Sequence, residues 1–269
     1  MKKLAMLDAE LLNYLQSHKQ ISLQKAVSLL NVSESTVRRL FQRIESEGIA
    51  TRLHGSLKIT DNYTAYRYEI NDSLNFKEKE TIGLLSARLV SDHDVIYIDW
   101  GTTVTHFCRA LAHRLSAGEV HNVKVFTNSL MNVDLLHRFC NVFLLGGQYQ
   151  EEKKCLTGYI TEETLKTLHF NKCFMCADGF RSMVGFTYYD FDVARITSYV
   201  LSNSNTSVML LDHTKFDDMA TVSLNSDRRF DYVVTDRSIP SMLSEEVRKY
   251  AQNIICSEAD IDVKIDPEG

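Results

Sequence analysis

Apolar residues recur at helical spacing three times in the first fifty residues of the chain. Residues 8–18 carry leucines on one side, and a second pattern follows Ser22, whose hydroxyl is suited to cap a helix start. A corner at Asn31-Val32 leads to a third pattern, which Ser33 can cap and Gly48 can end. The apolar positions of the three predicted helices are Leu11, Leu12, Leu15, Leu23, Ala26, Val27, Leu30, Val37, Leu40, Phe41 and Ile44.

The opposite face of the third predicted helix is basic and rich in hydroxyl groups. Two short helices joined by a corner, the second of them basic, are the parts of a helix-turn-helix, whose second helix reaches base edges and phosphates. Residues 49–60 then indicate a two-stranded wing that turns at His54-Gly55-Ser56. A three-helix protein-interaction module with a solvated basic face is the alternative. The residues predicted to contact double-stranded DNA are Ser33, Ser35, Thr36, Arg38, Arg39, Gln42, Arg43, Arg52 and His54.

The rest of the chain alternates short β-rich runs with amphipathic helices. This alternation predicts an α/β domain over residues 77–269, with a mostly parallel sheet covered by helices on both faces. The winged domain then comprises residues 1–60, and residues 61–76 form a linker with some local strand. The predicted strands are 95–99, 123–129, 141–147, 172–179, 207–212, 232–236 and 254–256, and the predicted helices are 77–91, 105–116, 130–139, 161–168, 194–204 and 245–252.

Charge and composition add three points. Residues 1–70 have a net charge of +3 and residues 71–269 a net charge of −8, as expected for a small nucleic-acid-binding domain joined to an acidic body. The chain has no apolar run of 18 residues, so we expect no contact with a membrane. Its six cysteines are scattered and mostly lie in apolar stretches, which favours reduced thiols in a cytoplasmic protein.

Polar residues follow the predicted strands, at the edge of a parallel sheet where ligands collect. The clearest stretch is VIYIDWGTTVT at 95–105, a strand, a small-residue turn and a helix start, which can direct N–H groups and hydroxyls at an anion. An ordinary βα turn is the alternative. The strand-end residues are Asp99, Gly101, Thr102, Thr103, Thr127, Asn128, Ser129, Gly146, Gly147, Asp178, Gly179, Asp212, Thr214, Lys215, Thr235 and Asp236. Together they suit a polyhydroxylated anion with its phosphate on Thr102 and Thr103.

The order of these motifs resembles the DeoR family of bacterial sugar-metabolism regulators. The matching stretches are DWGTT at 99–103, TNS at 127–129, LLGG at 144–147, ADG at 177–179 with GFT at 185–187, DHTKF at 212–216 and TD at 235–236. The N-terminal VSESTVRRL and GIATRLHG are similar to that family's winged helix-turn-helix, so the resemblance covers nearly the whole chain. Among the departures, Leu40 stands where the family often has aspartate, and Thr197 where it often has lysine.

The resemblance implies a transcriptional regulator, typically a repressor of a carbohydrate-metabolism operon, that binds operator DNA as an oligomer. It also implies a sensor domain related in fold to ribose-5-phosphate isomerase that binds a phosphorylated sugar or similar metabolite. The expected effector-binding residues are Asp99, Trp100, Gly101, Thr102, Thr103, Thr127, Asn128, Ser129, Gly146, Gly147, Asp178, Gly179 and Lys215. Trp100 has three open roles: stacking on the ligand, narrowing the pocket, or contacting another subunit.

Two other functions are compatible with parts of the sequence. Cys173 and Cys176 match a CxxC motif, but they fall in a predicted strand without a second pair of ligands, so we expect core cysteines and no metal or cofactor. The alternative to a regulator is a sugar-phosphate isomerase-like enzyme with Asp178 as the base. No convincing lysine and glutamate accompany Asp178, so we predict a regulator without catalytic residues.

Overall fold

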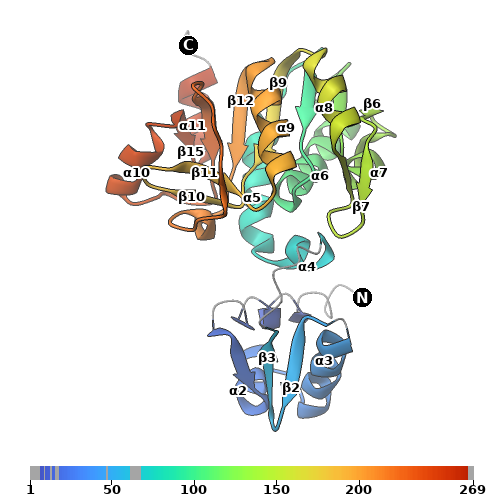
Figure 1. The fold of residues 1–269 in the computed structure, drawn as a ribbon, viewed down its shortest axis with the longest axis vertical. Helices are drawn as coiled ribbons and strands as arrows, with labels where there is room; N and C mark the ends of the chain where they lie inside the picture. The colour runs from blue at the N-terminus through green and yellow to red at the C-terminus, as the bar shows by residue number, and fades with distance from the viewer. Residues whose placement is uncertain are drawn as a thin grey trace. The chain divides into compact units, whose positions relative to one another are not determined.

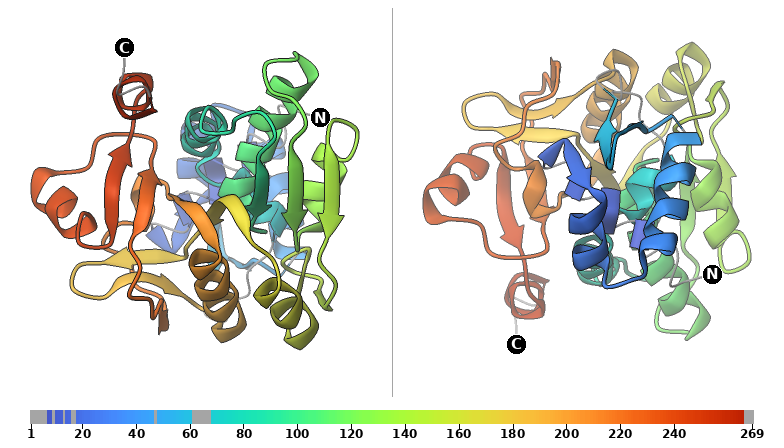
Figure 2. Two further views of the ribbon diagram at one scale, coloured as in Figure 1. Left: turned by 90° about the horizontal axis from the view of Figure 1, so that it is seen from above. Right: turned by 90° about the horizontal axis from the view of Figure 1, so that it is seen from below.

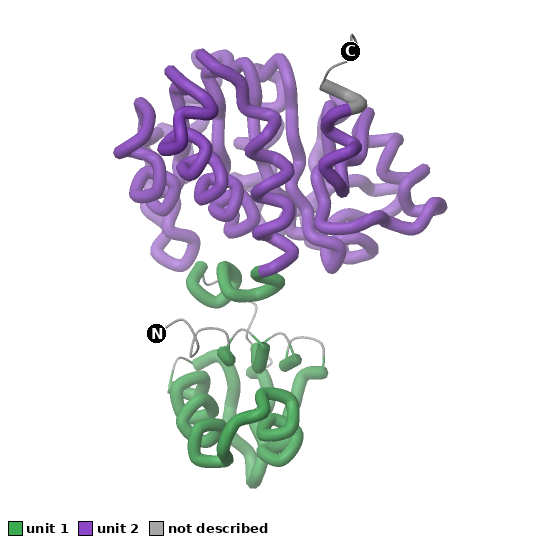
Figure 3. The backbone as a smooth tube through the Cα atoms, turned by 180° about the vertical axis from the view of Figure 1, so that it is seen from behind, with its two compact units in different colours: residues 1–76 green, residues 77–269 purple. Residues whose placement is uncertain are grey.

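In a computed structural model, the chain forms two compact units, residues 1–76 and residues 77–269 (Figure 3). The structure describes residues 7–8, 10–12, 14–15, 18–46, 48–60 and 68–265. Each unit has its own hydrophobic core.

The first unit is a helix-turn-helix with a small antiparallel sheet (Figure 1). The described residues between 7 and 15 are helical, and Leu11, Leu12 and Leu15 are buried as predicted. Strand order in the sheet is β1-β3-β2, so β1 joins the two strands of the predicted wing. The elements of this unit are β1 (Gln20–Ser22), α2 (Leu23–Leu30), α3 (Glu34–Ser46), β2 (Ala50–Leu53), β3 (Ser56–Ile59) and α4 (Tyr68–Ser73).

The predicted ends of the two central helices are confirmed. The Ser22 hydroxyl accepts a hydrogen bond from the backbone N–H of Lys25, and the Ser33 hydroxyl accepts one from Thr36. Gly48 follows α3 with a φ of +71°, a conformation that glycine adopts without steric cost. Strand β1 was not predicted, because its three residues pair only with β3, more than thirty positions along the chain.

The prediction of a linker with local strand is wrong for residues 68–73, which form the helix α4. Tyr68, Ile70 and Leu74 are buried, and the last two pack into the core of the first unit. A pattern of so few residues is too short to distinguish a helical turn from a strand, so the tertiary contacts decide it. The part of the predicted linker at 61–67 lies outside the described residues.

The second unit is built on a parallel seven-stranded sheet in the order β15-β14-β12-β9-β4-β5-β6 (Figure 2). Its strands are β4 (Val95–Ile98), β5 (Lys124–Thr127), β6 (Asn141–Leu144), β9 (Phe170–Cys176), β12 (Ser204–Leu210), β14 (Phe230–Val234) and β15 (Ala251–Ile255). Its α-helices are α5 (Phe76–Ala87), α6 (Thr102–Ser116), α7 (Leu130–Leu136), α8 (Tyr159–Lys166), α9 (Phe191–Ser202), α10 (Ser241–Val247) and α11 (Glu258–Ile265). The predicted parallel α/β domain is confirmed.

Helices cover both faces of this sheet (Figure 2). Helices α5, α6, α7 and α11 share one core with the strands, in which Phe107 of α6 stacks on Phe174 of β9 with ring centroids 4.2 Å apart. Helices α8 and α9 pack against each other on the opposite face. The alternation of apolar side chains along each strand therefore serves two cores, as expected for a parallel sheet.

Several short elements were missed or misplaced. Helix α6 begins at Thr102 rather than at residue 105, and α10 ends at Val247, because residue 252 belongs to β15. The elements missed in this unit are the hairpin of β7 (Gln148–Gln150) and β8 (Cys155–Thr157), the sheet of β10 (Gly179–Arg181), β11 (Gly185–Tyr188) and β13 (Val222–Ser223), the 3-10 turn η1 (His213–Lys215) and the helix α11 (Glu258–Ile265). Among the described residues, no helix combines the length and apolarity needed to cross a bilayer.

Candidate functional site

The stretch from Asp99 to Thr103 lies at the point where the strand order reverses. From β4 the chain proceeds to β5 and β6 on one side, then returns to place β9 on the other side of β4. Open parallel sheets bind ligands at such a switch point, beyond the carboxyl ends of the strands. The residues that follow β4 and β9, including Asp178 and Gly179, therefore lie at the expected place for a ligand.

The first turn of α6 leaves backbone N–H groups available at this point. The helix is preceded by Gly101 and has no side-chain cap, whereas Ser129 caps α7 and Asp190 caps α9. An uncapped helix start presents N–H groups and a partial positive charge to an anion. Thr102 and Thr103 add their hydroxyls in this first turn.

A buried lysine joins the first turn of α6. Lys79, on α5, is only 5% exposed, and its ammonium donates a hydrogen bond to the Thr102 hydroxyl over 3.0 Å. The two helices approach closely because Gly83 lies one turn further along α5, where a Cβ would be 2.6 Å from the carbonyl oxygen of His106. The ammonium is thus held beside the threonine that the sequence assigns to a phosphate.

Asp99 is a buried carboxylate at the end of β4. Burial raises its pKa to about 6, although backbone N–H groups of Trp100 and Cys176 donate to it and partly offset that effect. The Cys176 thiol also lies 3.7 Å from the carboxylate, and a Cβ on Gly101 would meet the same sulfur at 2.0 Å. Cys176 of the CxxC motif therefore packs against the site, and glycine is required beside it.

We expect Asp99→Asn to stabilise the protein more at pH 8 than at pH 4.5. A raised pKa means that the folded state binds the proton more tightly between about pH 4 and 6, so the wild type loses stability as the pH rises through this window. Removing the charge should raise the free energy of unfolding by about 2–3 kcal/mol at pH 8 and by little at pH 4.5. Urea denaturation of both proteins at both pH values measures this difference. An equal effect at the two pH values would contradict the buried charge.

Trp100 is buried within its own domain beneath a second lysine. The ring is 6% exposed, and the Lys153 ammonium lies 5.5 Å from its centroid. Lys153 precedes β8 and forms a salt bridge with Asp190, the cap of α9. Since the ring is enclosed by residues of the same chain, these contacts favour a role in shaping the site over one in contacting another subunit.

A third lysine, Lys215, lowers the pKa of Asp178, the carboxylate that follows β9. Burial raises the pKa of Asp178, whereas Lys215 and Lys153 lower it by their positive charge. Its carboxylate also accepts a hydrogen bond from the backbone N–H of Tyr189 over 2.9 Å. Acidic and basic groups from β9, η1 and the β7–β8 hairpin thus gather at the same end of the sheet.

Three predicted residues at the carboxyl end of β5 are fully buried and form hydrogen bonds within the protein. Asn128 accepts a hydrogen bond from the Tyr97 hydroxyl and donates one to the carbonyl oxygen of Leu156. Thr127 and Ser129 form local hydrogen bonds with Asn132, which also donates to the carbonyl oxygen of Asp99 over 2.6 Å. These contacts hold the turn that follows β4, at Asp99, in position.

The two glycines after β6 differ in their surroundings, and only Gly147 lies where two backbone segments approach closely. The carbonyl oxygen of Gly146 accepts a hydrogen bond from Thr161, and a Cβ on Gly147 would lie 2.6 Å from the carbonyl oxygen of Thr157. Gly179 is similar, because a Cβ there would lie 2.7 Å from the carbonyl oxygen of Asp218. The structure therefore gives Gly147 and Gly179 a packing role, whereas a Cβ on Gly146 would meet only the side chain of Ile160, at 3.8 Å.

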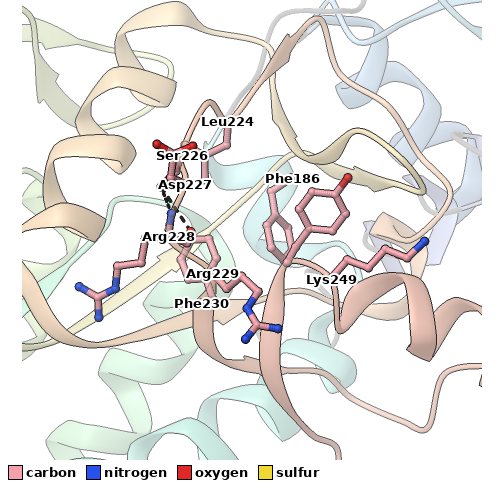
Figure 4. A pocket seen from close by; sticks show the side chains of 9 residues that line it. Phe186, Leu224, Ser226, Asp227, Arg228, Arg229, Phe230 and Lys249 are labelled. Carbon is pink, nitrogen blue, oxygen red and sulfur yellow. Dashed lines mark hydrogen bonds between the residues drawn. The ribbon is translucent and has the colours of Figure 1, made fainter.

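A pocket of about 150 Å³ lies away from these residues, at the amino end of β14 (Figure 4). Its lining includes Arg228, whose guanidinium donates to the carbonyl oxygens of Leu201, Ser204 and Asn205 and so joins neighbouring segments. It shares no residue with the predicted effector site and lies at the opposite end of the strands.

On the first unit, the exposed face of α3 carries three arginines with different surroundings. Arg38 forms a salt bridge with Glu34 one turn earlier, and Arg43 forms one with Asp8. Arg39 is exposed, and no ion pair to it is found among the described residues. Of the three, Arg39 is therefore the one whose guanidinium has no carboxylate partner in the part of the chain that the structure describes.

The remaining predicted DNA contacts lie at the start of α3 and on the wing. The Ser33 hydroxyl hydrogen-bonds to those of Ser35 and Thr36, at 3.0 and 2.9 Å. Gln42 is exposed on α3, and Arg52 and His54 are exposed on the wing. Gly55, in the turn between β2 and β3, has a φ of +71°.

Two family models match the chain in the same order as its two units. Residues 8–62 match the DeoR-like helix-turn-helix domain, and residues 74–237 match the DeoR C terminal sensor domain. The chain belongs to the DeoR family. It is therefore a DNA-binding transcriptional regulator with a C-terminal sensor domain, and the enzyme alternative is set aside.

Curated relatives of this DeoR-family regulator match it over almost their whole length. The lactose phosphotransferase system repressor of Lactococcus lactis subsp. lactis is 29% identical, covering 90% of this chain and 94% of the relative. The HTH-type transcriptional regulator IolR of Bacillus subtilis (strain 168) is 25% identical, covering 95% and 97%. Among solved structures, ribose 5-phosphate isomerase A from Methanocaldococcus jannaschii has a TM-score of 0.40 at 19% identity, over 53% of this chain and 55% of that one.

Sequence reasoning missed Lys79 and Lys153. Lys79 lies in an ordinary amphipathic pattern and Lys153 in the charged run EEKK, so neither follows a predicted strand. One signal pointed to Lys79: it precedes Ile82 by three positions and so lies on the apolar face of the predicted helix, where a lysine needs a buried partner.

Proposed function

We propose that this regulator represses a carbohydrate-metabolism operon and that a phosphorylated sugar, bound at the switch point of the sensor domain, relieves the repression. Residues 1–60 would contact the operator, and residues 77–269 would bind the effector and a second copy of the chain. As a regulator of transcription it would act in the cytoplasm.

The observation that carries this proposal is the pairing of Lys79 with Thr102 at the uncapped start of α6. An ammonium, two hydroxyls and free backbone N–H groups are the donors that a phosphate dianion requires. Asp99 and Asp178, at the ends of β4 and β9, are suited to accept hydrogen bonds from sugar hydroxyls. The site therefore combines donors for a phosphate with acceptors for a polyol.

The relatives support the carbohydrate assignment. Two are named lactose phosphotransferase system repressors: the Lactococcus lactis protein and a Staphylococcus epidermidis protein that is 28% identical over 78% of this chain. Because these relatives are named repressors, we infer that this chain also represses transcription. The particular sugar is left to experiment.

A thermal-shift panel of phosphorylated and unphosphorylated sugars and polyols tests the effector proposal. A ligand that binds only the folded state stabilises it by RT ln(1 + [L]/Kd), so about 2.7 kcal/mol is expected at a hundred times Kd. We expect at least one sugar phosphate to raise the melting temperature while its unphosphorylated counterpart does not. A panel in which no phosphorylated compound acts would contradict the proposal.

A further inference from the structure

A histidine and an aspartate bind each other beyond the ends of two neighbouring strands. Strands β12 and β14 pair in parallel, and His213 and Asp236 lie just past their carboxyl ends. The Asp236 carboxylate accepts hydrogen bonds from the backbone N–H and the ring Nδ1 of His213, over 2.7 and 2.9 Å. Thr235 and Arg237 also face this carboxylate, at 3.5 and 4.0 Å. The Asp236 side chain is only 6% exposed, so the two shorter hydrogen bonds are largely shielded from water.

This pair fixes one end of the 3-10 turn η1, which begins at His213. Asp212 closes the turn: its carboxylate accepts a hydrogen bond from the backbone N–H of Thr214 over 3.0 Å, and its carbonyl oxygen accepts one from that of Lys215. The turn is therefore a tight unit, and the contact between His213 and the end of β14 fixes all three of its residues together.

The other end of η1 is fixed against β10. Phe216, the residue after the turn, forms a parallel β-bridge with Phe180 of β10, and the centroids of their rings lie 6.0 Å apart. Phe216 is buried, and the guanidinium of Arg181 donates to the carbonyl oxygen of Asp217 over 3.2 Å. The turn is therefore held between two strands, by the His213 contact at its start and by apolar and backbone contacts at its end.

Lys215 is the residue whose position depends on these two contacts. It directly precedes Phe216, and the partner strand β10 begins immediately after Asp178. The Lys215 ammonium is close enough to Asp178 to lower the pKa of that carboxylate; Lys153 also lowers this pKa, and Asp190 raises it. A lysine side chain is long and flexible, so the place of its ammonium is well defined only where its backbone is fixed.

We propose that His213 and Asp236 are positioning residues of the effector site, which fix the backbone of η1 so that Lys215 stays beside Asp178. The inference rests on the proposed function, which places the effector at this end of the sheet. Lys215 then offers a donor, and Asp178 an acceptor, to neighbouring oxygens of a polyhydroxylated ligand. When the contact between His213 and Asp236 is broken, η1 is held at one end only, and the ammonium moves away from the carboxylate.

The titration of Asp178 in the full chain, without effector, tests this inference. Carbon-13 NMR of the aspartate carboxyl groups follows it, and Asp178→Asn assigns the signal. We expect His213→Leu to raise the pKa of Asp178, as Lys215→Met does, because both take the positive charge away from the carboxylate. His213→Ala is the second disrupting variant and should act in the same direction. His213→Asn should titrate like the wild type, because the asparagine amide nitrogen takes the place of Nδ1 and can donate to Asp236.

Two further variants separate positioning from a general loss of structure. His121→Leu is the matched control: it removes a histidine whose Nδ1 lies 3.7 Å from Asp92, at the amino ends of β4 and β5, and should leave the titration unchanged. In the Lys215→Met background, His213→Leu should shift the titration no further, since a residue that acts through another has no effect once the other is removed.

The inference is overturned if Asp178 titrates as in the wild type in His213→Leu or in Lys215→Met, or if the two changes add in the double variant. The sugar phosphate identified by thermal shift gives a second readout. Its affinity should fall at least about tenfold in His213→Leu and return in His213→Asn, with operator affinity unchanged. An unchanged affinity for this sugar phosphate would also overturn the inference. Because the titration uses no effector, its failure is distinct from a failure of the proposed function.

Discussion

Replacing Lys79 by methionine is expected to weaken effector binding, so that a much higher effector concentration is needed to release the DNA. A hydrogen bond from an ammonium to a phosphate contributes about 1.5–3 kcal/mol, so its loss weakens effector binding by roughly tenfold to a hundredfold. The Thr102 hydroxyl alone cannot neutralise the phosphate charge. Titration of operator-bound protein with the sugar phosphate found by thermal shift measures the change.

Stability separates this role from a purely structural one. Lys79 is buried, and an ammonium taken out of water costs free energy that an apolar side chain of similar length does not. Methionine keeps the length of the side chain, so we expect Lys79→Met to fold, and its thermal unfolding without effector checks this. Lys77→Met, at the exposed start of the same helix, is the matched control and should respond to effector like the wild type. A Lys79→Met protein that responds to the effector like the wild type would show that the Lys79 ammonium does not bind the phosphate.

Replacing Arg39 by alanine is expected to weaken operator binding by about 1–3 kcal/mol, or roughly fivefold to 150-fold. Arg39 is exposed on the second helix of the helix-turn-helix, the one that enters the major groove, where an arginine binds guanine or phosphate. Arg38 and Arg43 already have carboxylate partners on the protein, so each would have to leave a carboxylate in order to bind a DNA phosphate. Fluorescence anisotropy with DNA from the upstream region of the protein's own gene measures the affinity.

The salt dependence of that affinity shows how Arg39 acts. Loss of a phosphate contact lowers the slope of log affinity against log salt by about 0.9, whereas loss of a base contact leaves the slope and relaxes sequence preference. Lys166→Ala, which removes a positive charge from the exposed surface of α8, controls for net charge and should leave affinity unchanged. Wild-type affinity of Arg39→Ala would assign DNA recognition to other residues of α3 or to the wing.

The sequence was sufficient wherever a local pattern determines the structure. Helices α2 and α3 follow from the spacing of Leu30, Val37 and Ile44 and from two capping serines, and the seven strands of the large sheet are near-continuous apolar runs. The short strands β1 and β13 were missed, because each exists only through pairing with a strand more than thirty positions away. Residues 68–73 were misassigned for a similar reason.

The candidate site was predicted in part. Listing the polar residues at strand ends identified Asp99, Thr102 and Asp178, because a parallel sheet gathers these positions at one edge. The list could not distinguish side chains that face the site from those that support it, such as Asn128, whose partners are Tyr97 and Leu156. It also left out Lys79, because its hydrogen bond joins two helices 23 positions apart.

The central claim is that a phosphorylated sugar bound at the start of α6 controls DNA binding by the first unit. The most direct measurement is the anisotropy of labelled upstream DNA bound to the full chain, titrated in parallel with a sugar phosphate and with the same sugar lacking phosphate. The account predicts that the phosphorylated sugar releases the DNA from the wild type and, at the same concentration, not from Lys79→Met, and that the free sugar does neither. Equal release by both sugars, or equal release from both proteins, would contradict it.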